Sequence, residues 1–387
     1  MDGRGNALRL LLIAGNWLAR ALQTLLVVAS CMVCIAYGFA LFGDGSFGWA
    51  LLLWTTLQYP AIVIHELGHC AGARLGGMRV HTVQISAFEF NPLRRGFRWR
   101  WRPLPRRAGI GGYVIAYVDP ATPPRRARVL MTASGPALNL VFAAILFGLG
   151  ELLRPHALGW LCLMFAVINA MMGLANLVPH FGHLANDGLQ LWQLWKAGPN
   201  YAEPPHARLA GASMAGCTAD RLPEEDLAAM EADGPVMRLF ALWYRLKGDQ
   251  NRGEWGRAVA RQQAMDEAVA EIDPRLLAPW NDLLALLRAE LAFSRALVSN
   301  DAAALGQDLL PPRLAWYMPH FQARCLALQA ALNGDREACE HWLDACRREA
   351  EQSKDAAVPL SEAMLGSQVR ALLDRVRPAV SVEPTLA

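Results

Sequence analysis

One apolar segment carries the most informative residues of the chain: Tyr59-Pro60-Ala61-Ile62-Val63-Ile64-His65-Glu66-Leu67-Gly68-His69. It lies in the run 47–73, which as a helix rising about 1.5 Å per residue is long enough to cross a hydrocarbon core of about 30 Å. Ionisable side chains inside a membrane span are costly and usually mark a function. The segment therefore predicts a membrane helix that carries a functional site.

Three other apolar runs predict a mainly α-helical protein that crosses the membrane about four times. The predicted spans are 21–42, 47–73, 129–153 and 157–178. Hydrophobic residues make up 54% of the 387 residues and charged residues only 18%, which argues against an ordinary water-soluble protein. The formal charge of +3 also excludes a nucleic-acid binder that works through bulk charge.

The placement of arginine predicts the orientation in the membrane. The connection between spans three and four carries only Arg154, and the connection 43–46 carries no basic residue. The connection between spans two and three holds twelve arginines: Arg74, Arg79, Arg94, Arg95, Arg98, Arg100, Arg102, Arg106, Arg107, Arg125, Arg126 and Arg128. Because cytoplasmic loops collect positive charge, we expect both termini to be cytoplasmic, as in a multi-pass protein of a bacterial inner membrane.

The chain becomes soluble in composition after about Lys196, which predicts a membrane domain at 1–198 and a cytoplasmic α-helical domain at 199–387. Its amphipathic patterns predict helices at 235–247, 257–271, 276–297, 316–332 and 336–351. These helices could form an irregular solenoid or a plain bundle. We expect this domain to be the place where a protein partner could bind, although the helices could also serve only to bury one another.

The spacing of the two histidines predicts a zinc site. Residues i and i+4 share one face of a helix, so His65 and His69 can each bring one imidazole nitrogen to a single ion. Glu66 lies too far round the helix to be the third ligand, but it is close enough to take a proton from a water molecule on the metal. Coincidence is the alternative, and the membrane context argues against it.

A third ligand is expected where span four ends, at the same membrane face as the two histidines. Asp187 is the preferred candidate, because a carboxylate oxygen suits zinc. His183 precedes it by four residues and is the rival.

With these residues the sequence resembles the site-2 proteases, a family of intramembrane zinc metalloproteases. The resembling pieces are 65–69, Gly111-Gly112-Tyr113-Val114, Ser134-Gly135-Pro136-Ala137-Leu138-Asn139, Asn176-Leu177-Val178-Pro179 and Asp187-Gly188. The resemblance implies one zinc ion per chain held by His65, His69 and Asp187, with Glu66 as the catalytic base. It also implies that Asn139 lies near the site and donates to the substrate carbonyl or oxyanion; an interhelical hydrogen bond is the alternative.

The sequence departs from the family pattern just before Asp187. The family usually has Leu before the Asp-Gly pair, whereas this chain has Asn186, and the gap after Pro179 is a few residues longer. His180 and His183 lie in that gap.

A small sheet is predicted on the cytoplasmic side, from the segments 80–90, 97–102 and 110–118. In 97–102, aromatic and basic residues alternate with the period of a strand, so one face can enter the membrane interface while the other meets anionic headgroups. We expect a strand edge here to pair with an unwound substrate. The alternative is a charged run that only fixes the topology.

With this resemblance, the sequence predicts a zinc-dependent endopeptidase that cleaves peptide bonds in or near the transmembrane segment of a membrane protein, which we expect to have a single span. One alternative is a proteolytically silent relative that binds membrane helices, but such a protein has no need of Glu66. Another is a metal-ion transporter, but four spans without an internal repeat suit alternating access poorly.

Overall fold

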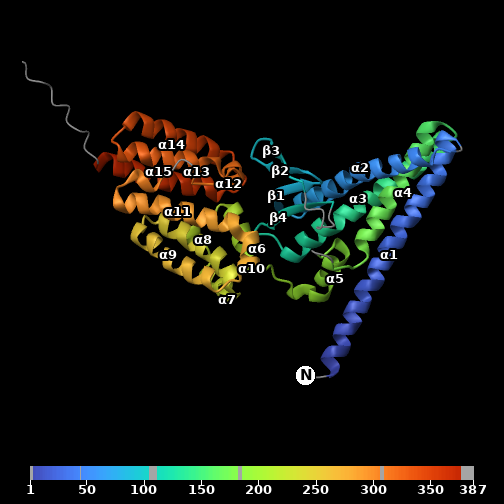
Figure 1. Ribbon diagram of the computed structural model, residues 1–387, viewed down its shortest axis with the longest axis horizontal. Coiled ribbons are helices and arrows are strands. Elements are labelled where there is room, and N and C mark those ends of the chain that lie inside the picture. Colours follow the sequence, from blue (N-terminus) through green and yellow to red (C-terminus); the bar gives the residue numbers. More distant parts are fainter. Residues whose placement is uncertain (1–2, 44, 104–110, 182–184, 306–308, 376–387) are drawn as a thin grey trace, which may run out of the picture. The chain divides into compact units, whose positions relative to one another are not determined.

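The computed structural model describes residues 3–43, 45–103, 111–181, 185–305 and 309–375 (Figure 1). The chain forms two compact units. The first comprises Met1–Pro92 and Phe97–Ala202, and the second comprises Leu93–Gly96 and Glu203–Ala387. Each unit is described by itself.

Within the described residues, four helices of the first unit are long and apolar enough to cross a membrane. They are α1 (Gly3–Phe42), α2 (Phe47–Leu75), α3 (Pro124–Leu153) and α4 (Ala157–Leu177). α3 packs against α2 and α4, and α1 packs along α4 and α2 (Figure 1). The prediction of four membrane helices is confirmed; the first helix begins earlier than expected, and its apolar part covers Ala14–Phe42.

A four-stranded antiparallel sheet connects α2 to α3. Its strands are β1 (Met78–Ile85), β2 (Phe88–Pro92), β3 (Phe97–Trp101) and β4 (Gly112–Val118), in the order β3-β2-β1-β4. The predicted sheet is therefore present, but the segment 80–90 contributes to two strands. The chain reverses at Ser86, which has a φ of 50°.

One face of the sheet packs on the C-terminal end of α2. Val80, Val83 and Ala116 of the sheet share a hydrophobic core with Ala73 of α2 and Ala127 of α3. This core joins the sheet to the two helices that supply most of the candidate site.

The β2–β3 hairpin has its charged side chains on one face and its aromatic rings on the other. Arg100 and Arg102 both bond to Glu89 Oε2, at 2.9 and 3.1 Å, and Glu89 is fully buried. Phe97, Trp99 and Trp101 are 58–64% exposed. A strand of a water-soluble sheet usually buries its aromatic rings and exposes its charges, so this hairpin is suited to an apolar surrounding at the exposed aromatic rings of β3.

The second unit is helical throughout its described regular structure. Its helices are α6 (Pro205–Ala215), α7 (Glu224–Ala232), α8 (Pro235–Asn251), α9 (Trp255–Ala270), α10 (Pro274–Leu277), α11 (Asn281–Ser299), α12 (Pro312–Tyr317), α13 (Pro319–Leu332), α14 (Arg336–Glu351) and α15 (Ala357–Arg375). α8, α9, α11, α13 and α14 lie on the five segments for which amphipathic patterns predicted helices. α6, α7 and α15 lie outside these five segments.

A network of buried charges joins four helices of this unit. The Arg324 guanidinium on α13 donates to Glu290 Oε2 of α11 and to Glu362 Oε1 of α15, both at 2.7 Å. Lys247 Nζ of α8 lies 3.2 Å from Glu290 Oε1. Arg324 is 1% exposed and Glu290 is fully buried. Removing one member of such a network would leave an unpaired buried charge, so its cost is high.

Candidate metal centre

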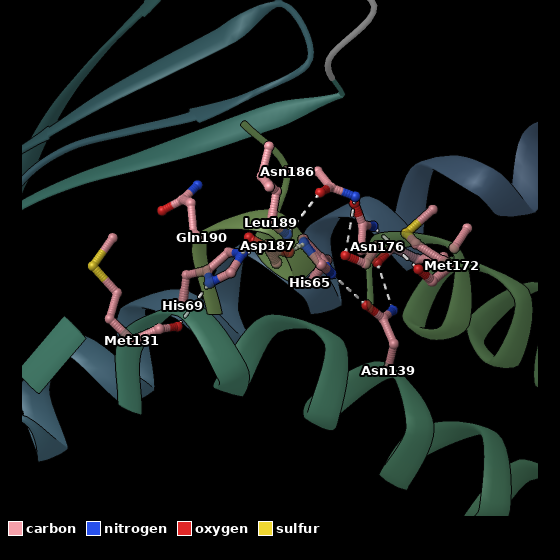
Figure 2. A network of polar contacts seen from close by, with 12 residues as sticks. His65, His69, Met131, Asn139, Met172, Asn176, Asn186, Asp187, Leu189 and Gln190 are labelled. Atoms are coloured by element: carbon pink, nitrogen blue, oxygen red, sulfur yellow. Dashed lines mark hydrogen bonds and ion pairs between the residues drawn. The ribbon is translucent and has the colours of Figure 1, made fainter. Parts of the chain in front are cut away.

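The two histidines of α2 meet the first residue of α5 (Asp187–Ala197) at one point (Figure 2). His65 Nε2 lies 3.0 Å from Asp187 Oδ2, and His69 Nε2 lies 3.5 Å from Asp187 Oδ1. The two imidazole Nε2 atoms are 3.1 Å apart. All three side chains are buried, and their ligand atoms lie within 4.8 Å of one another.

Each imidazole is held by an acceptor on its far side, which selects its tautomer. His65 Nδ1 is 2.7 Å from Asn139 Oδ1, and His69 Nδ1 is 2.8 Å from the Met131 carbonyl oxygen. A histidine that donates from Nδ1 has a lone pair on Nε2. Both lone pairs therefore point toward Asp187, as a metal ion would require (Figure 2).

The chemistry of this donor set fits zinc. Two neutral imidazoles and one carboxylate are a common set of protein ligands at catalytic zinc sites. The site is also shaped for close approach, because a Cβ atom built on Gly135 of α3 would overlap the His69 imidazole. Asp187 stands at the N-terminus of α5, where the helix dipole stabilises a negative charge.

Glu66 is buried beside the site with a free carboxylate oxygen. Within the described part of the chain, its Oε2 has no hydrogen-bond partner. Its Oε1 lies against the start of β4, where a Cβ atom built on Gly112 would be 2.7 Å away. An unpartnered buried carboxylate oxygen is expensive in an apolar region, which is a sign of a functional group.

Asn139 contacts His65 on the side of the ring that faces away from Asp187. Its Oδ1 faces His65 Nδ1, and its amide group donates to Ala61 O at 3.1 Å and to Asn169 Oδ1 at 2.8 Å. The amide is thus fully engaged by α2 and α4. In this arrangement Asn139 orients His65; the predicted role toward a substrate oxygen stays a prediction.

Asn186 is a site residue whose role the sequence did not reveal. Its Oδ1 accepts from the amides of Leu189 and His180, at 3.1 and 3.0 Å, and its Nδ2 donates to the carbonyls of Val178 and Asn176, at 2.7 and 3.2 Å. One side chain thus caps α5 and ties both ends of the loop before Asp187. The signal that could have indicated this role is an Asn directly before a helix that begins with Asp-Gly.

The loop before Asp187 contains two histidines, and the structure describes only one of them, His180. His183, the rival third ligand, lies outside the described residues. His180 Nε2 accepts a hydrogen bond from Arg20 Nε at 2.7 Å and does not belong to the metal-ligand cluster.

Comparison with known proteins identifies one family. Residues 59–158 match the model of peptidase family M50, the site-2 protease family, which confirms the resemblance over that stretch. His65, Glu66, His69 and Asn139 lie inside the matched residues, and Asp187 lies beyond them. Neither the curated proteins nor the solved structures gave a match.

Proposed function

We propose, from the premise of the M50 match, that this chain is a zinc-dependent intramembrane endopeptidase. It would hydrolyse peptide bonds in or near the transmembrane segment of a membrane-protein substrate. The observation that carries the proposal is the convergence of His65, His69 and Asp187 beside the free carboxylate oxygen of Glu66, among helices fit to span a membrane. A packing role alone does not account for four ionisable groups in such a place.

His65, His69 and Asp187 would hold the zinc ion, one per chain. When bound, zinc supplies a Lewis acid that polarises the scissile carbonyl and lowers the pKa of a coordinated water molecule. Glu66 takes a proton from the attacking water and later delivers it to the departing amine. Asn139 holds the His65 ring in the orientation that both steps need.

The edge of β4 is the place where an unwound substrate would lie. Among the described strands β4 pairs only with β1, so it is an edge strand of the sheet. A Cβ atom built on Gly112, at its start, would lie 2.7 Å from Glu66 Oε1, so this strand begins beside the catalytic carboxylate. A helix must open before its peptide bonds can be cleaved, and pairing with a strand edge replaces the hydrogen bonds that it loses. A single-span protein is the simplest substrate for this geometry.

The two parts of the chain would have different tasks. Residues 1–198 form the membrane-embedded metalloprotease domain, and residues 199–387 form a cytoplasmic helical domain that can bind a protein partner. The arginine-rich connection of α2 to α3 supports a cytoplasmic sheet and two cytoplasmic termini, as expected in a bacterial inner membrane.

Glu66→Gln tests the proposal directly. The variant should keep one zinc ion per chain and lose cleavage of a panel of single-span reporters in membranes, because the amide cannot accept the proton. Metal content by mass spectrometry and product formation by immunoblot are the measurements. Asp187→Ala should lose the metal; zinc kept by that variant would assign the third ligand to His183.

Three results would contradict the proposal. A parent protein without zinc would exclude the metal site. Zinc present without any Glu66-dependent product would favour a protein that binds membrane helices without cleaving them. Weak, readily exchanged zinc would favour transport.

A further inference from the structure

A polar face of α1 contacts the segment that leads to the third metal ligand. Asn16, Arg20 and Gln23 are spaced by four and three residues, so they lie on one face of the helix. Gln23 Nε2 donates to the carbonyl oxygen of Ala175, near the end of α4, at 2.9 Å. Polar side chains in the apolar part of a membrane helix are costly. These three all make hydrogen bonds to residues between Ala175 and Phe181.

The other two contacts hold the loop between α4 and α5. Asn16 makes a pair of hydrogen bonds with the backbone of Phe181: its Nδ2 donates to the carbonyl oxygen at 3.1 Å, and its Oδ1 accepts from the amide at 2.9 Å. Arg20 Nε donates to His180 Nε2 at 2.7 Å. Burial, and then the Arg20 charge, lower the pKa of His180, so the imidazole can stay neutral and accept this bond.

The loop transmits these contacts to the metal ligand. The amide of His180 donates to Asn186 Oδ1 at 3.0 Å, and the amide of Asn186 donates to the His180 carbonyl oxygen at 3.2 Å. Asn186 directly precedes Asp187 and caps its helix. A displacement of His180 therefore moves the residue next to the carboxylate that faces the two histidines of α2.

We propose that Asn16 and Arg20 are positioning residues of the metal centre, which hold Phe181 and His180 and thereby keep Asn186 and the Asp187 carboxylate in place. The inference rests on the proposed function, because it takes Asp187 as a zinc ligand. Groups that orient a metal ligand typically change the metal affinity about 10- to 100-fold when they are removed.

The zinc affinity of the full-length protein in detergent tests the inference, measured by competition with a chromogenic chelator. Asn16→Ala and Arg20→Ala should each bind zinc about tenfold more weakly than the parent. Thr24→Ala is the matched control: Thr24 is an exposed polar residue of the same helix, and its hydroxyl donates to the carbonyl oxygen of Arg20 within that helix. It should bind zinc like the parent.

A double-mutant cycle separates positioning from a general loss of structure. Asp187→Ala, which should lose its zinc on purification, keeps the two histidines, and their weak affinity can be measured at raised zinc concentrations. In this background Asn16→Ala should cause no further loss of affinity, because the residue acts through Asp187. An equal loss in both backgrounds would overturn the inference. Parent-like affinity of Asn16→Ala and Arg20→Ala would overturn it too, and would leave the proposed function standing. Absence of zinc from the parent would overturn both.

Discussion

At the scale of single residues, the site depends on how closely α2 and α3 approach each other. Gly135 has no side chain where the His69 ring lies, and the two helices could not keep this distance with any other residue there. The position of the His69 imidazole therefore depends on the absence of a side chain at Gly135 as well as on the contacts of His69 itself.

Gly135→Ala should weaken zinc binding by at least about tenfold, because the added methyl group must push the His69 imidazole away from its ligand position. Gly148→Ala is the control on the same helix, since a Cβ atom there would meet no atom within 4 Å. Chelator competition on both variants is the measurement. Equal affinities would show that His69 is not held where the structure places it.

The sequence predicted the residues of the site better than it predicted their contacts. His65, Glu66 and His69 could be found because the helical period is local and brings the two histidines to one face. The roles of Asn186 and Asn16 could not be found, because they arise from a loop and a helix that are far apart in the chain. For Asn139, the sequence left open whether it donates to a substrate oxygen or makes an interhelical hydrogen bond.

At the scale of elements, the exposed aromatic face of β3 is the feature that most calls for an apolar environment outside the protein. Phe88 of β2 stacks edge-on against Trp101, with ring centroids 5.0 Å apart, and extends the aromatic face across the hairpin. Tryptophan is favoured at the boundary between headgroups and hydrocarbon. We expect this face to lie in the membrane interface.

Replacing Trp99 and Trp101 by Phe tests this placement in liposomes. The difference between the emission spectra of the parent and the variant is the emission of Trp99 and Trp101. Brominated lipids should quench this difference. Trp255→Phe is the control, because Trp255 packs against Phe293 in the helical unit and its emission should not respond to the lipid. Quenching of Trp99 and Trp101 by aqueous iodide instead would contradict a place in the interface.

The elements themselves were largely predictable, for reasons that differ between them. Membrane helices follow from long apolar runs, and the ends of α2, α3 and α4 lie close to the predicted limits. The turn at Ser86 was missed because neither Gly nor Pro marks it, although the residue has a positive φ. Short helices such as α7 depend on their neighbours for stability, so their own pattern is weak.

At the scale of the whole molecule, the buried charge network makes the helical unit sensitive to acid. Burial alone would raise the pKa of Glu290, but the charges of Arg324 and Lys247 outweigh it and lower the pKa to about 2. Burial lowers the pKa of His320, which lies in the same region. Groups with a depressed pKa in the folded state stabilise the fold above their unfolded pKa values and lose this contribution as the pH falls.

Hydrogen exchange in α13 of the full-length protein should therefore accelerate as the pH falls below about 6.5, where unfolded His320 begins to bind a proton, and again below about 4.5 for Glu290. After correction for the intrinsic pH dependence of exchange, we expect more than about a tenfold acceleration between pH 7 and pH 4. The Glu290→Gln variant should be less stable than the parent at pH 7, and its hydrogen exchange should accelerate less as the pH falls. A response as steep as that of the parent would place the acid sensitivity elsewhere.

The distribution of the site over α2, α3 and α5 has a consequence for biosynthesis. A ribosome delivers α2 to the membrane long before it translates Asp187, so the histidines and Glu66 enter the bilayer without the carboxylate that completes their site. Under the proposed function, the nascent chain could not hydrolyse its neighbours in the insertion machinery at that stage. Proteolytic competence would arise only when α4 has been inserted and α5 has folded back, so the order of translation itself would protect the cell from the activity of an incomplete chain.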